Sequence, residues 1–249
     1  MRLVFVFAHQ DDEIAAAPRI RRAIAAGDEV ACAFLTDGKN PIVRDEESRR
    51  ALASLGVTDV AFIGSENQIG DGTLVESLDR ALMLLSARFD GTDEVWTLAW
   101  EGGHHDHDAA HLVALALAVE RGRRCFEVPL YTGFRRMGPF FRVCCPIADG
   151  WTSRKLTLRE VLANAALVRF YRSQIRTWLA LLPGILTTWR EHVREASAAR
   201  VQSRPHEGPL YYERRFHFPY ARFEVLARSF IEARLRPTLP ATEPRSHRR

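Results

Sequence analysis

The sequence contains no run of 18 or more apolar residues, so it does not predict a membrane-spanning helix. Its four cysteines include no CxxC pair, and the adjacent Cys144 and Cys145 are poorly placed to bridge each other. We expect all four to be reduced, mostly as small core residues. The apolar stretch 3–8 is too short, and too soon followed by charge, for a signal peptide. We therefore predict a cytoplasmic protein.

A basic surface suited to nucleic acid is also lacking. The net charge is +4, but residues 234–249 carry five arginines and one glutamate, which already amounts to +4. The rest of the chain is close to neutral and shows no basic stripe interleaved with aromatic residues. We expect no nucleic-acid partner, and we predict that 234–249 is a disordered basic tail.

What the sequence does contain is a regular alternation of short apolar runs and helical patterns over its first 130 residues. The runs predict strands at 3–9, 29–38, 59–64, 94–100 and 125–131. The patterns between them predict helices at 13–26, 44–57, 73–89 and 108–122. Continuous apolar runs are typical of parallel strands that are buried on both faces. We predict an α/β fold with a doubly wound, mostly parallel sheet flanked by helices.

The alternation ends after residue 131. There the sequence predicts a hairpin at 134–147, long helices at 154–182 and 184–200, and a last strand at 211–218. Without a clean linker, we predict one domain, 1–233, with a core at 1–131 and a C-terminal elaboration at 132–233. The apolar stretch 178–189 is too short to span a membrane and is expected to pack against the protein.

Two loops rich in histidine and carboxylate residues are expected to meet at one edge of this sheet. The segment HQDDE (9–13) follows the first strand, and EGGHHDHD (101–108) follows the fourth. In the common strand order 3-2-1-4, the crevice at the carboxyl ends lies between strands 1 and 4. Ligands of open α/β sheets bind in that crevice.

The residues of these loops suit zinc, which accepts imidazole and carboxylate ligands and keeps one position open in catalytic sites. His9 and Asp12 are three apart at a strand-to-helix turn and can face one point, and one histidine from the second loop would complete the set. Asp11 could then stand beside a bound water as general base.

Simpler interpretations exist for both loops. Acidic residues before a helix often cap it, and a histidine-rich loop can be a solvated turn. His107 and His111 are spaced as in the zincin motif HExxH, but Asp108 stands where that motif needs glutamate. We expect His111 to begin the buried face of its helix. The first strand is not followed by GxGxxG, which disfavours a nucleotide-binding oxidoreductase.

Together, AHQDDE (8–13) and GGHHDHDAAH (102–111) resemble the motifs AHPDDE and HPDH of the PIG-L/LmbE family of zinc-dependent N-deacetylases. Weaker matches follow over residues 2–216: TDG (36–38), Arg44 and Glu47 ahead of LGV (55–57), YRSQ (171–174) and YYER (211–214). The resemblance implies a Rossmann-like fold and a hydrolase that removes the N-acetyl group from an N-acetylglucosamine moiety in a larger conjugate.

The resemblance also implies roles for individual residues. His9, Asp12 and His107 would bind the metal. Asp11 would take a proton from the metal-bound water and return it to the leaving amine, and His104 would stabilise the oxyanion. Arg44 would bind the sugar or its aglycone. Fe²⁺ or Co²⁺ could replace Zn²⁺ with the same ligand types.

Two departures from the family motifs occur, since Gln10 and His105 replace the usual prolines. Both fall between the residues that carry the chemistry, so we expect the catalytic set to be intact. The expected partner is a small N-acetylated amino sugar conjugate whose aglycone the sequence does not specify. The alternatives are a non-catalytic sugar- or nucleotide-binding module and a zinc hydrolase of another small amide.

Overall fold

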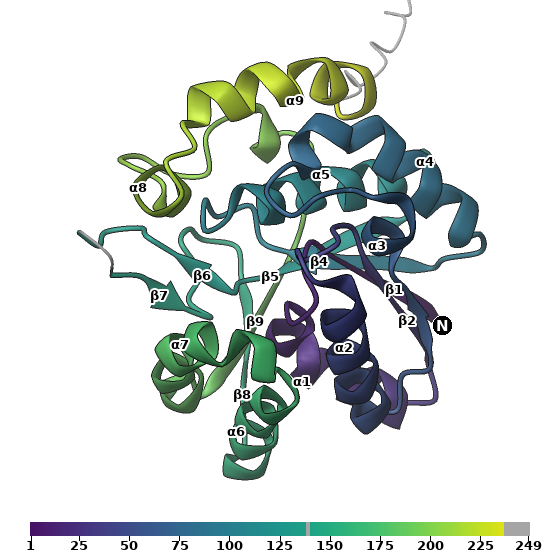
Figure 1. Ribbon diagram of the computed structural model, residues 1–249, viewed down its shortest axis with the longest axis vertical. Coiled ribbons are helices and arrows are strands. Elements are labelled where there is room, and N and C mark those ends of the chain that lie inside the picture. The colour runs from purple at the N-terminus through teal and green to yellow at the C-terminus, as the bar shows by residue number, and fades with distance from the viewer. Residues whose placement is uncertain (138–139, 237–249) are drawn as a thin grey trace, which may run out of the picture.

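The computed structural model describes residues 1–137 and 140–236, and one seven-stranded sheet organises it (Figure 1). The strand order is β3-β2-β1-β4-β5-β9-β8. The strands are β1 (Arg2–Phe7), β2 (Glu29–Phe34), β3 (Asp59–Ala61), β4 (Glu94–Leu98), β5 (Arg124–Val128), β8 (Thr152–Lys155) and β9 (Arg190–Glu195). The first five are parallel, and β9 and β8 each pair antiparallel to their neighbour. The predicted order 3-2-1-4 is therefore confirmed.

Helices cover both faces of the sheet, as the α/β prediction requires (Figure 1). One face carries α1 (Glu13–Ala25), α2 (Pro41–Leu55), α6 (Leu158–Ala165) and α7 (Ile175–Thr187). The other carries α3 (Ile63–Asn67), α4 (Leu78–Arg88), α5 (His105–Glu120) and α9 (Tyr220–Arg234). Because strand side chains alternate, Val4 and Val6 enter one core while Leu3, Phe5 and Phe7 enter the other.

Aromatic side chains from adjacent strands form rows across the α1–α2 face. Phe5 pairs in register with Trp96, and Trp96 with Phe126. Their ring centroids lie 5.7 and 4.7 Å apart. Such cross-strand aromatic contacts stabilise a sheet and fix its register. The register matters for function, because it sets where β1 and β4 end relative to each other.

The predicted helix 154–182 is wrong. Residues 152–155 form strand β8, and the helical part is broken into α6, two 3₁₀ segments (Ala166–Phe170 and Arg172–Gln174) and α7. Tertiary contacts explain the break. Tyr171 bonds Ser48 on α2 (3.1 Å between the oxygens), and Ser173 donates to Glu47, with its backbone N–H at 2.9 Å. These contacts hold the 171–174 turn against α2.

Two further predictions in the C-terminal region are also wrong. The helix expected at 184–200 ends at Thr187, and β9 follows because its backbone completes the sheet beside β5. The strand expected at 211–218 is instead the short helix α8 (Tyr211–Arg215), where Glu213 accepts a hydrogen bond from the backbone of Leu210 at 2.8 Å. In each case contacts distant in sequence decide the conformation.

The remaining predictions for this region have mixed outcomes. Residues Tyr131–Thr132 (β6) and Arg142–Val143 (β7) pair antiparallel over two positions, so a hairpin is present but its first strand lies before the predicted start at 134. Most of the predicted tail, 237–249, lies outside the described residues, and the predicted domain limits stay predictions. Within the described residues, no helix is both long and apolar enough to cross a membrane.

A buried ion pair ties β9 to the sheet. Arg194 donates to Glu127 of β5 at 2.6 Å, and the Glu127 side chain is fully buried. Removing one partner of such a pair leaves a buried, uncompensated charge.

We expect Arg194→Met to lower the free energy of unfolding by about 3 kcal/mol, measured by urea denaturation. The exposed pair of Arg124 with Glu195 provides the control, and Arg124→Met should leave the urea midpoint unchanged. Equal shifts of the urea midpoint in Arg194→Met and Arg124→Met would contradict the stabilising role of the buried pair.

Candidate metal centre and active site

The loop after β1 folds back on itself to begin α1. The backbone N–H of His9 donates to Asp12 Oδ2 at 2.8 Å, and the N–H of Asp12 lies 3.2 Å from the carbonyl of His9. This turn places both side chains on the same side of the loop. Both are buried, so the segment is not merely a solvated helix cap.

The loop after β4 brings three histidines to the same place. His104 is the N-cap of α5, and its Nδ1 accepts a hydrogen bond from the backbone N–H of Asp106 at 3.1 Å. Gly103 permits the close approach of this loop to residue 131, since a Cβ there would lie 2.1 Å from the carbonyl oxygen of Tyr131. The two predicted loops therefore meet.

His9, Asp12 and His107 converge on one point. Nδ1 of His9 lies 3.2 Å from Nε2 of His107, which lies 3.1 Å from Oδ1 of Asp12. Two imidazole nitrogens and a carboxylate oxygen facing one another in a buried space fit the ligand set of a divalent cation. The chemistry of the donors is thus compatible with zinc.

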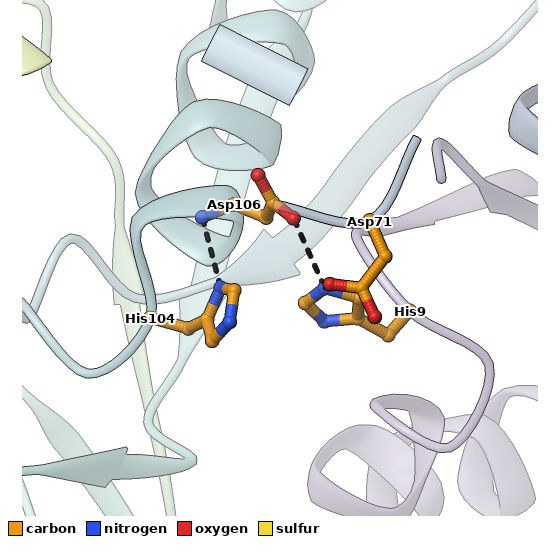
Figure 2. A group of neighbouring side chains, drawn as sticks. All are labelled: His9, Asp71, His104 and Asp106. Carbon is orange, nitrogen blue, oxygen red and sulfur yellow. Dashed lines mark hydrogen bonds and ion pairs between the residues drawn. The ribbon is translucent and has the colours of Figure 1, made fainter. Parts of the chain in front are cut away.

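The other ring nitrogen of His9 is held by Asp106, as Figure 2 shows. Nε2 of His9 lies 3.2 Å from Oδ2 of Asp106, whose oxygens also accept the backbone N–H groups of Gly72 and Leu74. A carboxylate behind a histidine ligand typically fixes the ring and the tautomer. With the proton on Nε2, the Nδ1 lone pair of His9 points at His107 and Asp12.

A second set of neighbouring groups, formed by His9, Asp71, His104 and Asp106, has spacing that could also hold a cation (Figure 2). Hydrogen bonds already occupy much of this set: Asp106 binds two backbone N–H groups, and His104 Nδ1 accepts a third. The set of His9, Asp12 and His107 is therefore the better candidate for a resident metal.

The pKa of His9 lies well above its ordinary value. Burial opposes the charged ring, but hydrogen bonds to Asp106 and Asp71 and the charge of Asp12 outweigh it. A cation among the ligand atoms competes with this proton, so metal binding is expected to strengthen as the pH rises.

His104 has the opposite character. Burial, with the charges of His9 and His107, holds its pKa well below the ordinary value, so its ring is neutral. Since Nδ1 accepts the N–H of Asp106, the ring proton is on Nε2. The ring stacks edge-on to Phe216, with centroids 4.5 Å apart. His104 can therefore donate one hydrogen bond into the site.

Asp11 has both carboxylate oxygens engaged. Oδ1 accepts from Arg44 at 2.9 Å, and Oδ2 accepts from the indole N–H of Trp178 at 2.9 Å. Burial raises the pKa of Asp11 to about 6, although Arg44 and Trp178 oppose the shift and the charge of Asp12 adds to it. Its backbone φ of 122° is unusual for a residue other than glycine. Glu13 supports it by accepting its backbone N–H at 3.0 Å.

The side chain of Arg44 is bound to other groups of the protein, which a purely substrate-binding role does not require. Its guanidinium is buried and contacts Asp11 and the backbone carbonyls of Gln10 and Gly38. It does line the cavity, so a role in substrate binding stays a prediction. Glu47 supports the nearby 171–174 turn through Ser173, as a supporting residue would.

The two residues that replace the family prolines have structural contacts of their own. The buried side chain of Gln10 donates to Asp45 at 2.6 Å. His105 bonds the carbonyl of Gly72 at 3.0 Å and stacks on Phe218. His111 is buried and bonds the carbonyl of Leu98 at 2.8 Å, so it does not form a zincin pair with His107.

A cavity of about 230 Å³ opens beside these residues. Asp11, Asp12, His104 and His107 form its polar floor, and Tyr131, Phe216 and Lys39 contribute to the rim and walls. Residues from α7, including Thr177 and Trp178, form one wall. The C-terminal elaboration therefore completes a site whose polar floor comes from the N-terminal half.

The sequence did not identify Asp71, Asp106 or Trp178 as residues of the site. Asp106 lies within HHDHD and could have been weighed as a partner for a ligand histidine. Trp178 lies in an apolar stretch, and nothing in that pattern indicates that its indole reaches a carboxylate 167 positions earlier.

Residues 4–118 match the family model PIG-L, described as GlcNAc-PI de-N-acetylase. This match covers just under half of the chain. The match runs from β1 to near the end of α5 and includes both converging loops. The resemblance seen in the two motifs is thereby confirmed.

Solved structures show the same fold at low sequence identity. A deacetylase from the biosynthesis pathway of teicoplanin has a TM-score of 0.60 and 14% identity, covering 79% of this chain and 99% of that one. The zinc-inhibited form of teicoplanin deacetylase gives 0.58 and 14%, with the same coverage. N,N'-diacetylchitobiose deacetylase from Pyrococcus horikoshii gives 0.53 and 16%, covering 83% and 87%. No curated protein matches the sequence significantly.

The contact of Asp106 with His9 is expected to raise the affinity of the site for Zn²⁺. We expect Asp106→Asn to weaken Zn²⁺ binding by roughly 10–100-fold, because the ring of His9 loses its carboxylate partner. Chelator competition on the purified chain measures this.

Asp71→Asn is the matched control, since Asp71 also faces His9 but belongs only to the second set. We expect it to retain Zn²⁺ affinity within a fewfold. Loss of the metal in Asp71→Asn would instead place the cation in the set of His9, Asp71, His104 and Asp106.

Proposed function

We propose that this protein is a zinc-dependent hydrolase that removes the N-acetyl group from an N-acetylglucosamine-type conjugate. The convergence of His9, Asp12 and His107, with Asp11 beside them in one cavity, is the observation that carries the proposal. A non-catalytic binding module would not need a buried carboxylate whose pKa is raised to about 6 next to such a set.

His9, Asp12 and His107 would hold the ion. When bound, zinc acts as a Lewis acid on the amide carbonyl and makes hydroxide available near neutral pH. The same donors accept Fe²⁺ or Co²⁺. One structure of similar fold is a zinc-inhibited form, so the activating metal is to be established by measurement.

Asp11 would act as the general base. It takes a proton as water adds to the amide carbon, and it returns that proton to the nitrogen as the carbon–nitrogen bond breaks. Acetate and the free amine are the products. Arg44 and Trp178 hold the carboxylate from two sides, which limits its rotation and aims its remaining lone pairs at the cavity.

His104 would stabilise the oxyanion of the tetrahedral intermediate. Its neutral ring carries the proton on Nε2, and that N–H is the donor such an oxygen requires. The cap of α5 fixes the ring before substrate arrives, so little reorganisation accompanies the reaction.

The size of the cavity supports a small substrate. At about 230 Å³, it is smaller than the roughly 300–1,000 Å³ of pockets for drug-sized ligands. One N-acetylated sugar ring suits it, with the rest of the conjugate outside. The proteins of similar fold include an N,N'-diacetylchitobiose deacetylase and a deacetylase of the teicoplanin biosynthesis pathway, which agrees with an N-acetylated amino sugar.

Replacing the base tests the mechanism. We expect Asp11→Asn to reduce acetate release by roughly 10²–10⁴-fold, since the amide cannot accept the proton. Acetate is measured across a panel of N-acetyl sugar conjugates with the Zn²⁺-loaded chain, and metal analysis should find about one ion in both proteins. Full turnover by the variant would exclude Asp11 as the base.

The hydrogen bond from Trp178 to Asp11 is expected to affect how the rate depends on pH. Asp11 works only when ionised, so the rate should fall as the pH drops through its pKa, about 6 without a cation and lower beside one. The Trp178 N–H lowers that pKa. Trp178→Phe should therefore move the acid limb of the kcat/KM profile to higher pH.

Metal content should be unchanged in Trp178→Phe, because the indole touches none of the three ligands. Trp151→Phe is the matched control: its indole N–H has no partner in the part of the chain described, so its acid limb should stay in place. If the acid limb of the kcat/KM profile is the same in Trp178→Phe and the parent, the hydrogen bond from Trp178 does not lower the pKa of Asp11.

A further inference from the structure

Large apolar side chains are exposed mainly on one part of the molecule. The structure describes fifteen exposed large hydrophobic residues, and eight fall between 137 and 189. They are Met137, Phe140, Leu158, Leu162, Ile175, Leu179, Leu186 and Trp189. They belong to α6, α7, the segment between α7 and β9, and the β6–β7 hairpin, which lie together on one side of Figure 1. Such a concentration marks an interaction surface.

Helix α7 is apolar on two faces. Trp178, Leu181 and Ile185 are buried against the core, as the sequence predicted for this stretch. Ile175, Leu179 and Leu186 follow a separate stripe at spacings of four and seven, and they are 43%, 60% and 39% exposed. The expectation that the stretch packs is therefore right for one face only.

The same region is strongly cationic. Residues 131–190 contain two acidic residues, Asp149 and Glu160, and outside 149–160 they carry seven arginines and no aspartate or glutamate. These are Arg135, Arg136, Arg142, Arg169, Arg172, Arg176 and Arg190. Among the described residues, none of the seven forms an ion pair, although many arginines elsewhere do. All are at least partly exposed.

A groove of about 720 Å³ lies within this region, between the hairpin and α7. Arg136, Arg142 and Arg190 line it together with Phe140 and Trp189. Cationic groups beside exposed aromatic rings suit the boundary where lipid head groups meet acyl chains.

We propose that this surface, formed by α6, α7 and the β6–β7 hairpin, docks the protein on an anionic lipid bilayer. Exposed leucine and isoleucine side chains of α7 enter the outer acyl region, and the arginines contact lipid phosphates. This is peripheral binding, and it agrees with the lack of a spanning helix in the described chain.

The charge favours a bilayer over other occupants. Two copies that meet through this surface would each bring seven unpaired arginines, which repel. A folded acidic partner needs a matched shape, whereas a fluid bilayer accommodates side chains that project separately from two helices and a hairpin. The dispersed arrangement of Met137, Leu162 and Leu179 therefore suits lipid.

Binding to vesicles tests the proposal without turnover, so its outcome is independent of the proposed deacetylase activity. The full chain is sedimented with phosphatidylcholine vesicles containing 30% phosphatidylserine, and with phosphatidylcholine alone. We expect clear binding to the anionic vesicles, weak binding to the neutral ones, and loss of binding in high salt.

Two variants separate the apolar and cationic contributions. Ile175→Ser with Leu179→Ser should weaken binding by at least about tenfold, because apolar burial is lost. Arg172→Gln with Arg176→Gln should weaken it by roughly 25-fold, at about fivefold for each arginine. These side chains are exposed and unpaired, so the fold should be unaffected.

Matched controls use exposed residues outside this surface. Met83→Ser with Val225→Ser, and Arg80→Gln with Arg228→Gln, should bind anionic vesicles like the parent. The proposal fails if the parent does not sediment with anionic vesicles, or if the serine variant on α7 binds as well as its control. Self-association that Leu179→Ser abolishes, without vesicle binding, would instead make the surface a contact between two copies.

Discussion

The parallel pairing of β1 with β4 is the constraint on which the site depends. The two strands are neighbours in register, so the segments that follow their carboxyl ends lie side by side. These segments carry His9 and His107, which are 98 residues apart in sequence. His9 comes from one loop and His107 from the other. Any shift in register would separate their ring nitrogens, and the rows of aromatic residues across the sheet oppose such a shift.

The site also depends on the C-terminal elaboration, in a different way. The polar floor is built within the region that matches the family, yet one oxygen of Asp11 is bound by Trp178, well beyond that region. The turn that positions α7 is fixed to α2 through Ser173 and Glu47. The N-terminal half and the C-terminal elaboration are thus joined at the carboxylate proposed as the general base.

The sequence predicted the first half of the fold and the two converging loops because both depend on local patterns. Apolar runs identify buried parallel strands, and right-handed crossovers then leave few orders for them. The second half was predicted poorly because its helices end where distant groups bind the backbone, as Glu47 does at Ser173. Asp106 and Trp178 were missed for the same reason, since each acts through a partner that only the folded chain brings near.

The backbone conformation of Asp11 lowers the stability of the fold, while its side chain is the proposed general base. A φ of 122° is a conformation that glycine adopts freely and other residues adopt at a cost of about 1–3 kcal/mol. By backbone energy alone, glycine would be preferred at this position. The chain instead keeps a carboxylate there and restrains it with Arg44, Glu13 and Trp178, so a substitution that relieved the backbone strain would also leave the buried guanidinium of Arg44 without its carboxylate.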